Sequence, residues 1–170
     1  MRGALIAVLL AGLAAAPALA GQAPRVSIAT LAQLPTPLPL PYDPTRDAKA
    51  DVAAAKAKAR AEHKLLLIDL GGNWCGDCRV LAGILKLPEV AGFVARNYVI
   101  VNVDVGRMNR NLDIPARYGV KRLEGVPSLL VVDGRGHLED AGHIAALADA
   151  RSMTPQALAD WLASWTAPPS

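Results

Sequence analysis

Three short runs of apolar residues stand out from the polar positions along the chain. Residues 64–70 and 126–132 are almost continuously apolar, as buried strands are, whereas residues 98–105 alternate between apolar and polar positions. Each run has the length of a strand rather than that of a helix. The turn sequence Asp-Gly-Arg-Gly at 133–136 follows the last run and predicts a hairpin that leads into a fourth strand.

Helical patterns fill the segments between these runs. Asp47 can cap an alanine-rich, charged segment, and Pro88 divides a helix with one apolar face from a second helical piece. Gly119 closes a short helix, and Thr154 with Pro155 begins a last one. The predicted helices span residues 47–63, 75–86, 88–97 and 113–118, with the last helix starting at residue 154.

The predicted order is helix–strand–helix–strand–helix–strand–strand–helix. Strands separated by helices need crossover connections, which favour parallel neighbours, whereas strands joined by a tight turn are antiparallel. The sequence therefore predicts an α/β fold with a mixed central sheet flanked by helices.

The first twenty residues have the pattern of a secretory signal. Arg2 is followed by the apolar stretch 4–16, and Ala18-Leu19-Ala20 provides the small residues of a cleavage site. We therefore expect a signal peptide at 1–20, cleavage after Ala20, export to an oxidising compartment, and no stable membrane association afterwards. An uncleaved membrane anchor is the alternative, although the apolar stretch is short for a bilayer.

Residues 21–46 are rich in proline, with five prolines between positions 35 and 44. Proline removes backbone donors and favours an extended path, so we interpret this segment as a tether that precedes a domain at 47–170. Two alternatives remain. The segment could lie along the domain through Leu38, Leu40 and Tyr42, or it could bind a proline-recognising partner.

Charge argues against two classes of partner. Removing residues 1–20 lowers the formal net charge from +3 to +2 and leaves a chain of ordinary single-domain length. A net charge this small gives no reason to expect binding to nucleic acid or to an anionic membrane.

The two cysteines of the chain, Cys75 and Cys78, are three positions apart at the start of a predicted helix. Unpaired amides and the helix dipole favour a thiolate at that place. We expect Cys75 to be the exposed nucleophile and Cys78 the resolving thiol that attacks its mixed disulfide.

Other uses of a cysteine pair fit less well. A structural zinc site needs about four ligands, and a c-type haem site needs histidine at position 79, which is arginine. A purely structural disulfide remains the main alternative, although a bridge that closes so small a loop removes little chain entropy.

Four stretches of the chain resemble the thioredoxin superfamily, and in particular its exported bacterial members. They are LLLIDLGGNWCGDC, VNVDV, RYGV and GVPSLLVVDGRG, and the resemblance runs from about residue 47 to residue 165. It implies a thioredoxin fold and a thiol–disulfide oxidoreductase whose only redox group is the Cys75–Cys78 disulfide, without a dissociable cofactor.

The resemblance also implies roles around the dithiol. Trp74 would contact the substrate beside the nucleophile. Pro127 would form a cis bond with Val126, which presents its backbone to an extended client segment. Asp69, six residues before Cys75, would be the buried acid that accepts a proton from the resolving cysteine through water.

Two features depart from the family pattern. Gly76-Asp77 stands where Gly-Pro is common, so we expect the Asp77 carboxylate to oppose a thiolate at Cys75 and Arg79 to offset that charge. Residues 121–125, which lead to Pro127, form a longer segment than is usual in the family. We therefore expect the rim of the substrate groove to differ from that of other members.

These observations predict a periplasmic thiol–disulfide oxidoreductase that exchanges disulfides with cysteine-containing client proteins. The negative charge at Asp77 and the buried acid favour a reductant, which in an oxidising compartment requires a membrane electron-transfer partner. The alternative is a non-catalytic thioredoxin-fold module that holds a client or an assembly partner, with an idle or structural disulfide.

Overall fold

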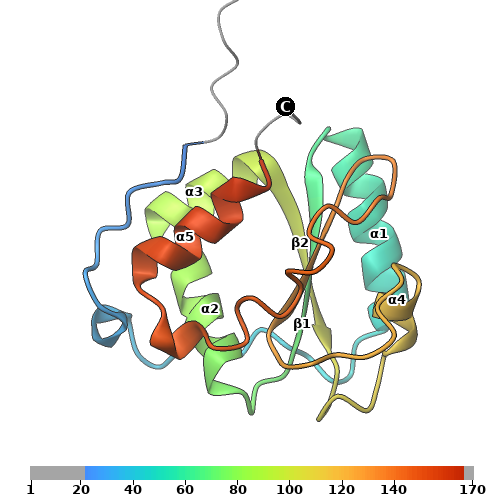
Figure 1. Ribbon diagram of the computed structural model, residues 1–170, viewed down its shortest axis with the longest axis horizontal. Coiled ribbons are helices and arrows are strands. Elements are labelled where there is room, and N and C mark those ends of the chain that lie inside the picture. Colours follow the sequence, from blue (N-terminus) through green and yellow to red (C-terminus); the bar gives the residue numbers. More distant parts are fainter. Residues whose placement is uncertain (1–21, 167–170) are drawn as a thin grey trace, which may run out of the picture.

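Within residues 22–166, which the computed structural model describes, a three-stranded mixed sheet forms the centre of the protein (Figure 1). The expected signal segment therefore lies outside the described residues. The central strand β1 (Leu65–Gly71) pairs in parallel with β2 (Tyr98–Asp104) and antiparallel with β3 (Ser128–Val132). The predicted α/β class with a mixed sheet is confirmed.

Helices cover both faces of this sheet (Figure 1). In that view α1 and α4 lie to the right of the sheet, and α2, α3 and α5 lie to the left. Leu66 and Ile68 of β1 belong to the core beneath α1, whereas Leu67 belongs to the core beneath the other helices. The elements are α1 (Ala48–Ala61), α2 (Gly76–Leu85), α3 (Pro88–Asn97), α4 (Asp113–Ala116), α5 (Pro155–Ser164) and the 3-10 turns η1 (Leu31–Gln33) and η2 (Ala150–Ser152).

Capping side chains start two of the helices as the sequence predicts. The Asp47 carboxylate accepts hydrogen bonds from the amides of Lys49 and Ala50 at 3.1 Å. The Thr154 hydroxyl accepts a hydrogen bond from the Ala157 amide, also at 3.1 Å. Each cap satisfies amides that a helix leaves without an internal partner, so these two boundaries follow from local sequence.

The predicted fourth strand is reduced, in the described chain, to one bridge between Val132 and Leu138. The turn at 133–136 does form. Beyond it, the buried carboxylate of Asp140 accepts the Val131 amide at 3.0 Å, so a side chain occupies the edge of β3 where a strand was expected. The prediction of a fourth strand is therefore wrong.

The proline-rich segment packs on the domain. We call its described part, residues 22–46, the N-terminal arm. Leu34 and Tyr42 of the arm are buried and Leu38 packs against the core around α2, whereas Leu40 is 62% exposed. In Figure 1 the arm, coloured blue to cyan, passes along the side that carries α3 and α5 and then crosses toward α1. The interpretation as a free tether is wrong for the arm, because its apolar side chains find partners on the domain.

Candidate active site

The two thiols lie at the first turn of α2. Cys75 caps the helix, and its sulfur accepts a hydrogen bond from the Cys78 amide at 3.2 Å. The thiol of Cys75 in turn donates to the carbonyl oxygen of Val126 at 3.3 Å. Both thiols are free in the structure. The helix N-terminus therefore offers a negative sulfur both an amide donor and a favourable dipole.

Neither cysteine is widely open to solvent. Cys75 is 5% exposed and Cys78 is fully buried. The prediction of an exposed nucleophile is corrected, because the sulfur of Cys75 lies against the loop that carries Val126. Cys75 is nevertheless the more exposed of the two cysteines, as expected, since Cys78 lies deeper along the helix.

The loop before β3 faces the sulfur of Cys75. Its Val126–Pro127 peptide bond is cis. Ser128, the first residue of β3, pairs with β1, and its hydroxyl donates to the carbonyl oxygen of Gly125 at 2.7 Å. These contacts tie the loop to the end of the central strand, which places the Val126 carbonyl beside Cys75.

Asp69 lies beneath the dithiol and is fully buried. Its Oδ1 accepts a hydrogen bond from the Tyr42 hydroxyl at 2.8 Å, and its Oδ2 has no partner among the described residues. Burial raises the pKa of Asp69 from 3.8 to about 7, although the hydrogen bond from Tyr42 acts in the opposite direction. Burial, followed by the hydrogen bond with Cys75, also raises the pKa of Cys78 above its ordinary range. An acid that titrates near neutral pH is suited to accept and return a proton.

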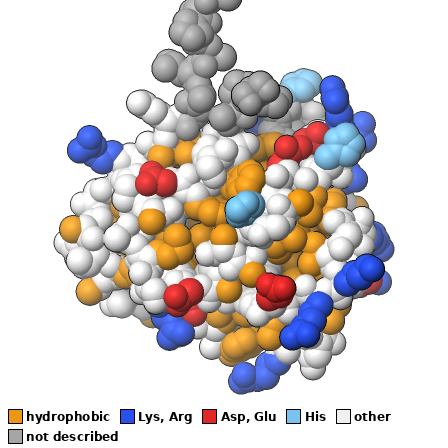
Figure 2. All heavy atoms as spheres, viewed as in Figure 1, with side chains coloured by type: hydrophobic (Ala, Val, Ile, Leu, Met, Phe, Trp, Pro, Cys, Tyr) orange, Lys and Arg blue, Asp and Glu red, His pale blue; other side chains and the backbone are white. Residues whose placement is uncertain are grey.

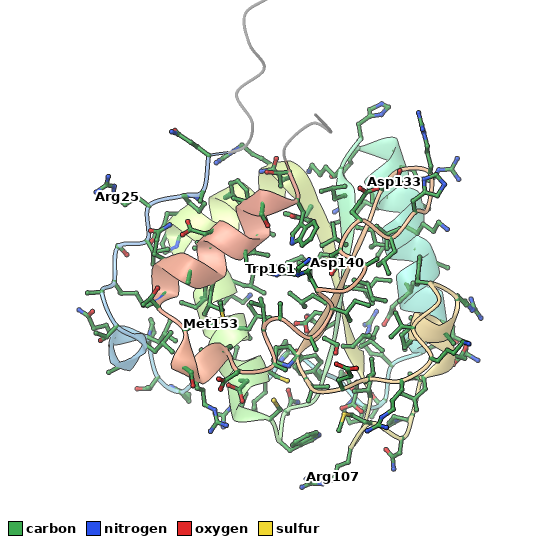
Figure 3. All side chains as sticks on the ribbon, in the orientation of Figure 1. Arg25, Arg107, Asp133, Asp140, Met153 and Trp161 are labelled. Carbon is green, nitrogen blue, oxygen red and sulfur yellow. The ribbon has the colours of Figure 1, made fainter. Side chains whose placement is uncertain are left out.

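Trp74 forms an exposed platform next to the dithiol. The indole is 46% exposed, and its Nε1 donates to the carbonyl oxygen of Gly106 at 2.7 Å. The Arg107 guanidinium lies over the ring, 4.8 Å from its centroid. Figure 3 places Arg107 at the tip of the molecule from which α2 starts, and Figure 2 shows further basic side chains around α4. Beside the dithiol, the rim of the site therefore carries the indole of Trp74 and the positive charge of Arg107.

The carboxylate of Asp77 already has a counter-charge. It accepts the Arg151 amide at 2.8 Å and forms a salt bridge with the Arg151 guanidinium at 3.1 Å. Arg79, which the sequence suggested for this role, instead donates to the carbonyl oxygen of Leu38 at 3.4 Å. Asp77 therefore opposes a negative sulfur at Cys75 less than the sequence alone suggests.

Sequence reasoning missed three parts of the site. Arg151 is far from the motif in sequence, and no local pattern marks it. Arg107 follows β2 in a polar stretch of the sequence, and no motif marks it either. Asn73 and Tyr42 bind each other: the Asn73 side chain donates to the Tyr42 carbonyl at 2.7 Å and accepts its amide at 3.1 Å. Tyr42, an aromatic residue in a proline-rich segment, was noted only as a packing residue.

The fold and this site together define a class, a thioredoxin-type fold with a dithiol at the start of a helix. Residues 47–134, more than half of the chain, match the thioredoxin-like family. The chain belongs to this family. The resemblance to the thioredoxin superfamily is thus confirmed.

Individual relatives agree with this assignment. A crystal structure described as a disulphide isomerase from Xylella fastidiosa Temecula1 is 36% identical, has a TM-score of 0.69, and covers 75% of this chain and 97% of its own. Thioredoxin-T from Drosophila melanogaster is 34% identical over 46% of this chain, and thioredoxin from Thiocapsa roseopersicina is 30% identical over 39%. The matched regions span 45% and 64% of those two relatives.

Proposed function

We propose that this protein is an exported thiol–disulfide oxidoreductase that reduces disulfides in client proteins. The observation that carries the proposal is the arrangement of Cys75, Cys78 and Asp69. One sulfur caps a helix, the second is buried behind it, and an acid with a pKa of about 7 lies beneath. A disulfide that only stabilised the fold would need no such acid. The cysteine pair is itself the redox group, so no dissociable cofactor takes part.

The first step is attack on the client. The Cys75 thiolate attacks one sulfur of the client disulfide, and the other client sulfur leaves with the bonding electrons and takes up a proton. The Val126 carbonyl, at the end of the loop that faces Cys75, offers a backbone acceptor to an extended client segment. Trp74 offers the client an exposed apolar surface on the other side.

The second step is resolution by Cys78. Its thiol gives its proton to the Asp69 carboxylate, and its sulfur attacks the sulfur of Cys75. A bond forms between Cys75 and Cys78, and the bond between Cys75 and the client breaks. The departing client sulfur takes up the second proton. Two electrons have then passed from the dithiol to the client, which is released as a dithiol.

Electron flow toward the client follows from the electrostatics of the dithiol. A strongly oxidising pair has a reduced form that is stabilised as a thiolate. Here burial disfavours the thiolate of Cys78, and the Val126 carbonyl accepts a hydrogen bond from the protonated Cys75 thiol. The Cys78 amide, which donates to the Cys75 sulfur, and Arg151 act in the opposite direction, but the charge of Arg151 is shared with Asp77. In an oxidising compartment the pair must be reduced again, so a membrane electron-transfer partner completes the cycle.

Export is proposed from residues 1–20, whose charge, apolar stretch and small-residue site follow the secretory pattern. Within residues 22–166, no helix combines the length and the apolar character needed to cross a bilayer. Expression of the full chain in a bacterium tests export directly. A periplasmic protein whose mass corresponds to cleavage after Ala20 supports the proposal, and an uncleaved protein in the membrane fraction contradicts it.

Trapping variants test the exchange. Cys78→Ala leaves a nucleophile without a resolving thiol, so mixed disulfides with clients should accumulate and disappear on reduction. Cys75→Ala should trap none, and equal trapping by both variants would contradict the two roles. Equilibration of the wild type with glutathione tests the direction. We expect a potential nearer the thioredoxin value of about −270 mV, whereas a value near about −120 mV would identify an oxidant.

A further inference from the structure

Tyr42 reaches the dithiol site from outside the segment that matches the family. It belongs to the N-terminal arm, is 1% exposed, and donates its hydroxyl proton to Asp69 Oδ1 at 2.8 Å. A Cβ atom at Gly71 would lie 2.6 Å from the hydroxyl oxygen of Tyr42 and 2.9 Å from the sulfur of Cys78. The tyrosine hydroxyl, the carboxylate and the resolving thiol therefore meet around a residue that has no side chain.

Asn73 holds the arm in this position. Its side-chain amide makes two hydrogen bonds with the backbone of Tyr42, one as donor at 2.7 Å and one as acceptor at 3.1 Å. Asn73 is only two residues before Cys75, so the arm is fastened to the loop that carries the nucleophile. Packing alone would not require a paired contact of this kind, because the ring of Tyr42 is already buried.

We propose that Tyr42 is a positioning residue for the proton acceptor Asp69. Its hydroxyl holds Oδ1 of the carboxylate and leaves Oδ2 to receive the proton of Cys78 in the resolving step. This inference rests on the thiol–disulfide exchange proposed above. Oδ2 is buried and has no hydrogen-bond partner among residues 22–166, so it is available for that proton.

The surroundings of Asp69 make this hydrogen bond the dominant polar contact of the carboxylate. Its neighbours in the sheet are Asn102 of β2 and Leu129 of β3, which carry no charge. The titratable groups that face it are Tyr42 from the arm and Cys78 from α2. Burial and the nearby carboxylate raise the pKa of Tyr42 far above its ordinary range, so the hydroxyl keeps its proton and remains the donor. A hydrogen bond to a buried carboxylate stabilises the ionised form.

The test replaces Tyr42 by phenylalanine, which keeps the ring and removes the hydroxyl. Loss of the donor should raise the pKa of Asp69 by about 1, measured from the carboxyl carbon signal in NMR spectra of the reduced protein. The pH dependence of the resolving rate, followed on a preformed mixed disulfide, should move to higher pH by the same amount. Below pH 7, where Asp69 is mostly protonated in both proteins, resolution should be about tenfold slower than in the wild type.

Tyr98→Phe is the matched control. The hydroxyl of Tyr98 is also buried and donates to the Leu162 carbonyl at 2.6 Å, at the side of the sheet that carries α5. This variant loses a comparable hydrogen bond, so its stability should fall, but the pKa of Asp69 and the pH profile should not change. Asn73→Ala, which releases the backbone of Tyr42, should shift both in the same direction as Tyr42→Phe.

Further measurements separate this inference from the function on which it rests. In an Asp69→Asn background, Tyr42→Phe should cause no additional loss of resolving rate, and an additive loss would overturn the proposal. An unchanged pKa of Asp69 in Tyr42→Phe would overturn it as well. If the wild type resolves no mixed disulfide, the proposed function fails, and the NMR titration still decides whether Tyr42 sets the state of Asp69. Should Tyr42→Phe not fold, the Asn73→Ala titration decides it.

Discussion

Replacing Asp69 by asparagine should change how the stability of the reduced protein depends on pH. Burial raises the pKa of the carboxyl from 3.8 to about 7 in the folded state. Between these two values the folded protein holds a proton that the unfolded chain has lost. The free energy of unfolding of the wild type should therefore fall as the pH rises through this window.

The size of the effect follows from the same two pKa values. Each unit of difference corresponds to about 1.4 kcal/mol, so ionisation of Asp69 should cost the folded state about 4 kcal/mol at pH 8. Asparagine has nearly the same shape, and its carbonyl oxygen can still accept the hydrogen bond from Tyr42. The variant should therefore gain about 4 kcal/mol relative to the wild type between pH 4 and pH 8.

Urea unfolding at several pH values, followed by tryptophan fluorescence with a thiol reductant present, measures this difference. Asp133→Asn is a useful control. Burial raises the pKa of Asp133, but hydrogen bonds from the His137, Arg135 and Gly136 amides outweigh it and hold the pKa below its ordinary value. Its contribution should therefore be lost only as the pH falls below about 3.8, so between pH 4 and pH 8 the stability difference between Asp133→Asn and the wild type should stay constant. A constant difference between Asp69→Asn and the wild type across this range would refute the reasoning.

Two other substitutions test the packing and the charge of the site. Gly71→Ala should destabilise the protein by about 1–3 kcal/mol in urea unfolding, because its methyl group would lie 2.9 Å from the Cys78 sulfur and even closer to the tyrosine ring of the arm. Gly134→Ala, which meets no atom within 4 Å, should be nearly neutral, and equal losses in both variants would contradict the packing argument. Arg151→Ala should change stability very little in urea unfolding, since its salt bridge with Asp77 is largely exposed on the arginine side. It should nevertheless slow alkylation of the nucleophilic thiol by iodoacetamide, because Asp77 loses its counter-charge. Arg151→Lys should retain the wild-type rate, and an unchanged rate in Arg151→Ala would argue against this electrostatic role.

Features that depend on neighbouring residues could be predicted from the amino-acid sequence. Asp47 and Thr154 start their helices through contacts two or three residues away. Apolar runs of strand length predicted β1, β2 and β3 to within a few residues. The position of Cys75 at a helix N-terminus also follows from local order, since the apolar strand and the helical pattern flank the motif directly.

Contacts between groups that are distant in the sequence could not be predicted in this way. The turn sequence after β3 predicts a fourth strand. In the structure, however, the Asp140 carboxylate accepts the amide of Val131 at the edge of β3. Tyr42 lies 27 residues before Asp69, and Arg151 lies 74 residues after Asp77. Side-chain periodicity carries information about the face of an element but not about its partner. A contact closed over so long a loop depends on the packing of the whole chain, so no local pattern could specify it.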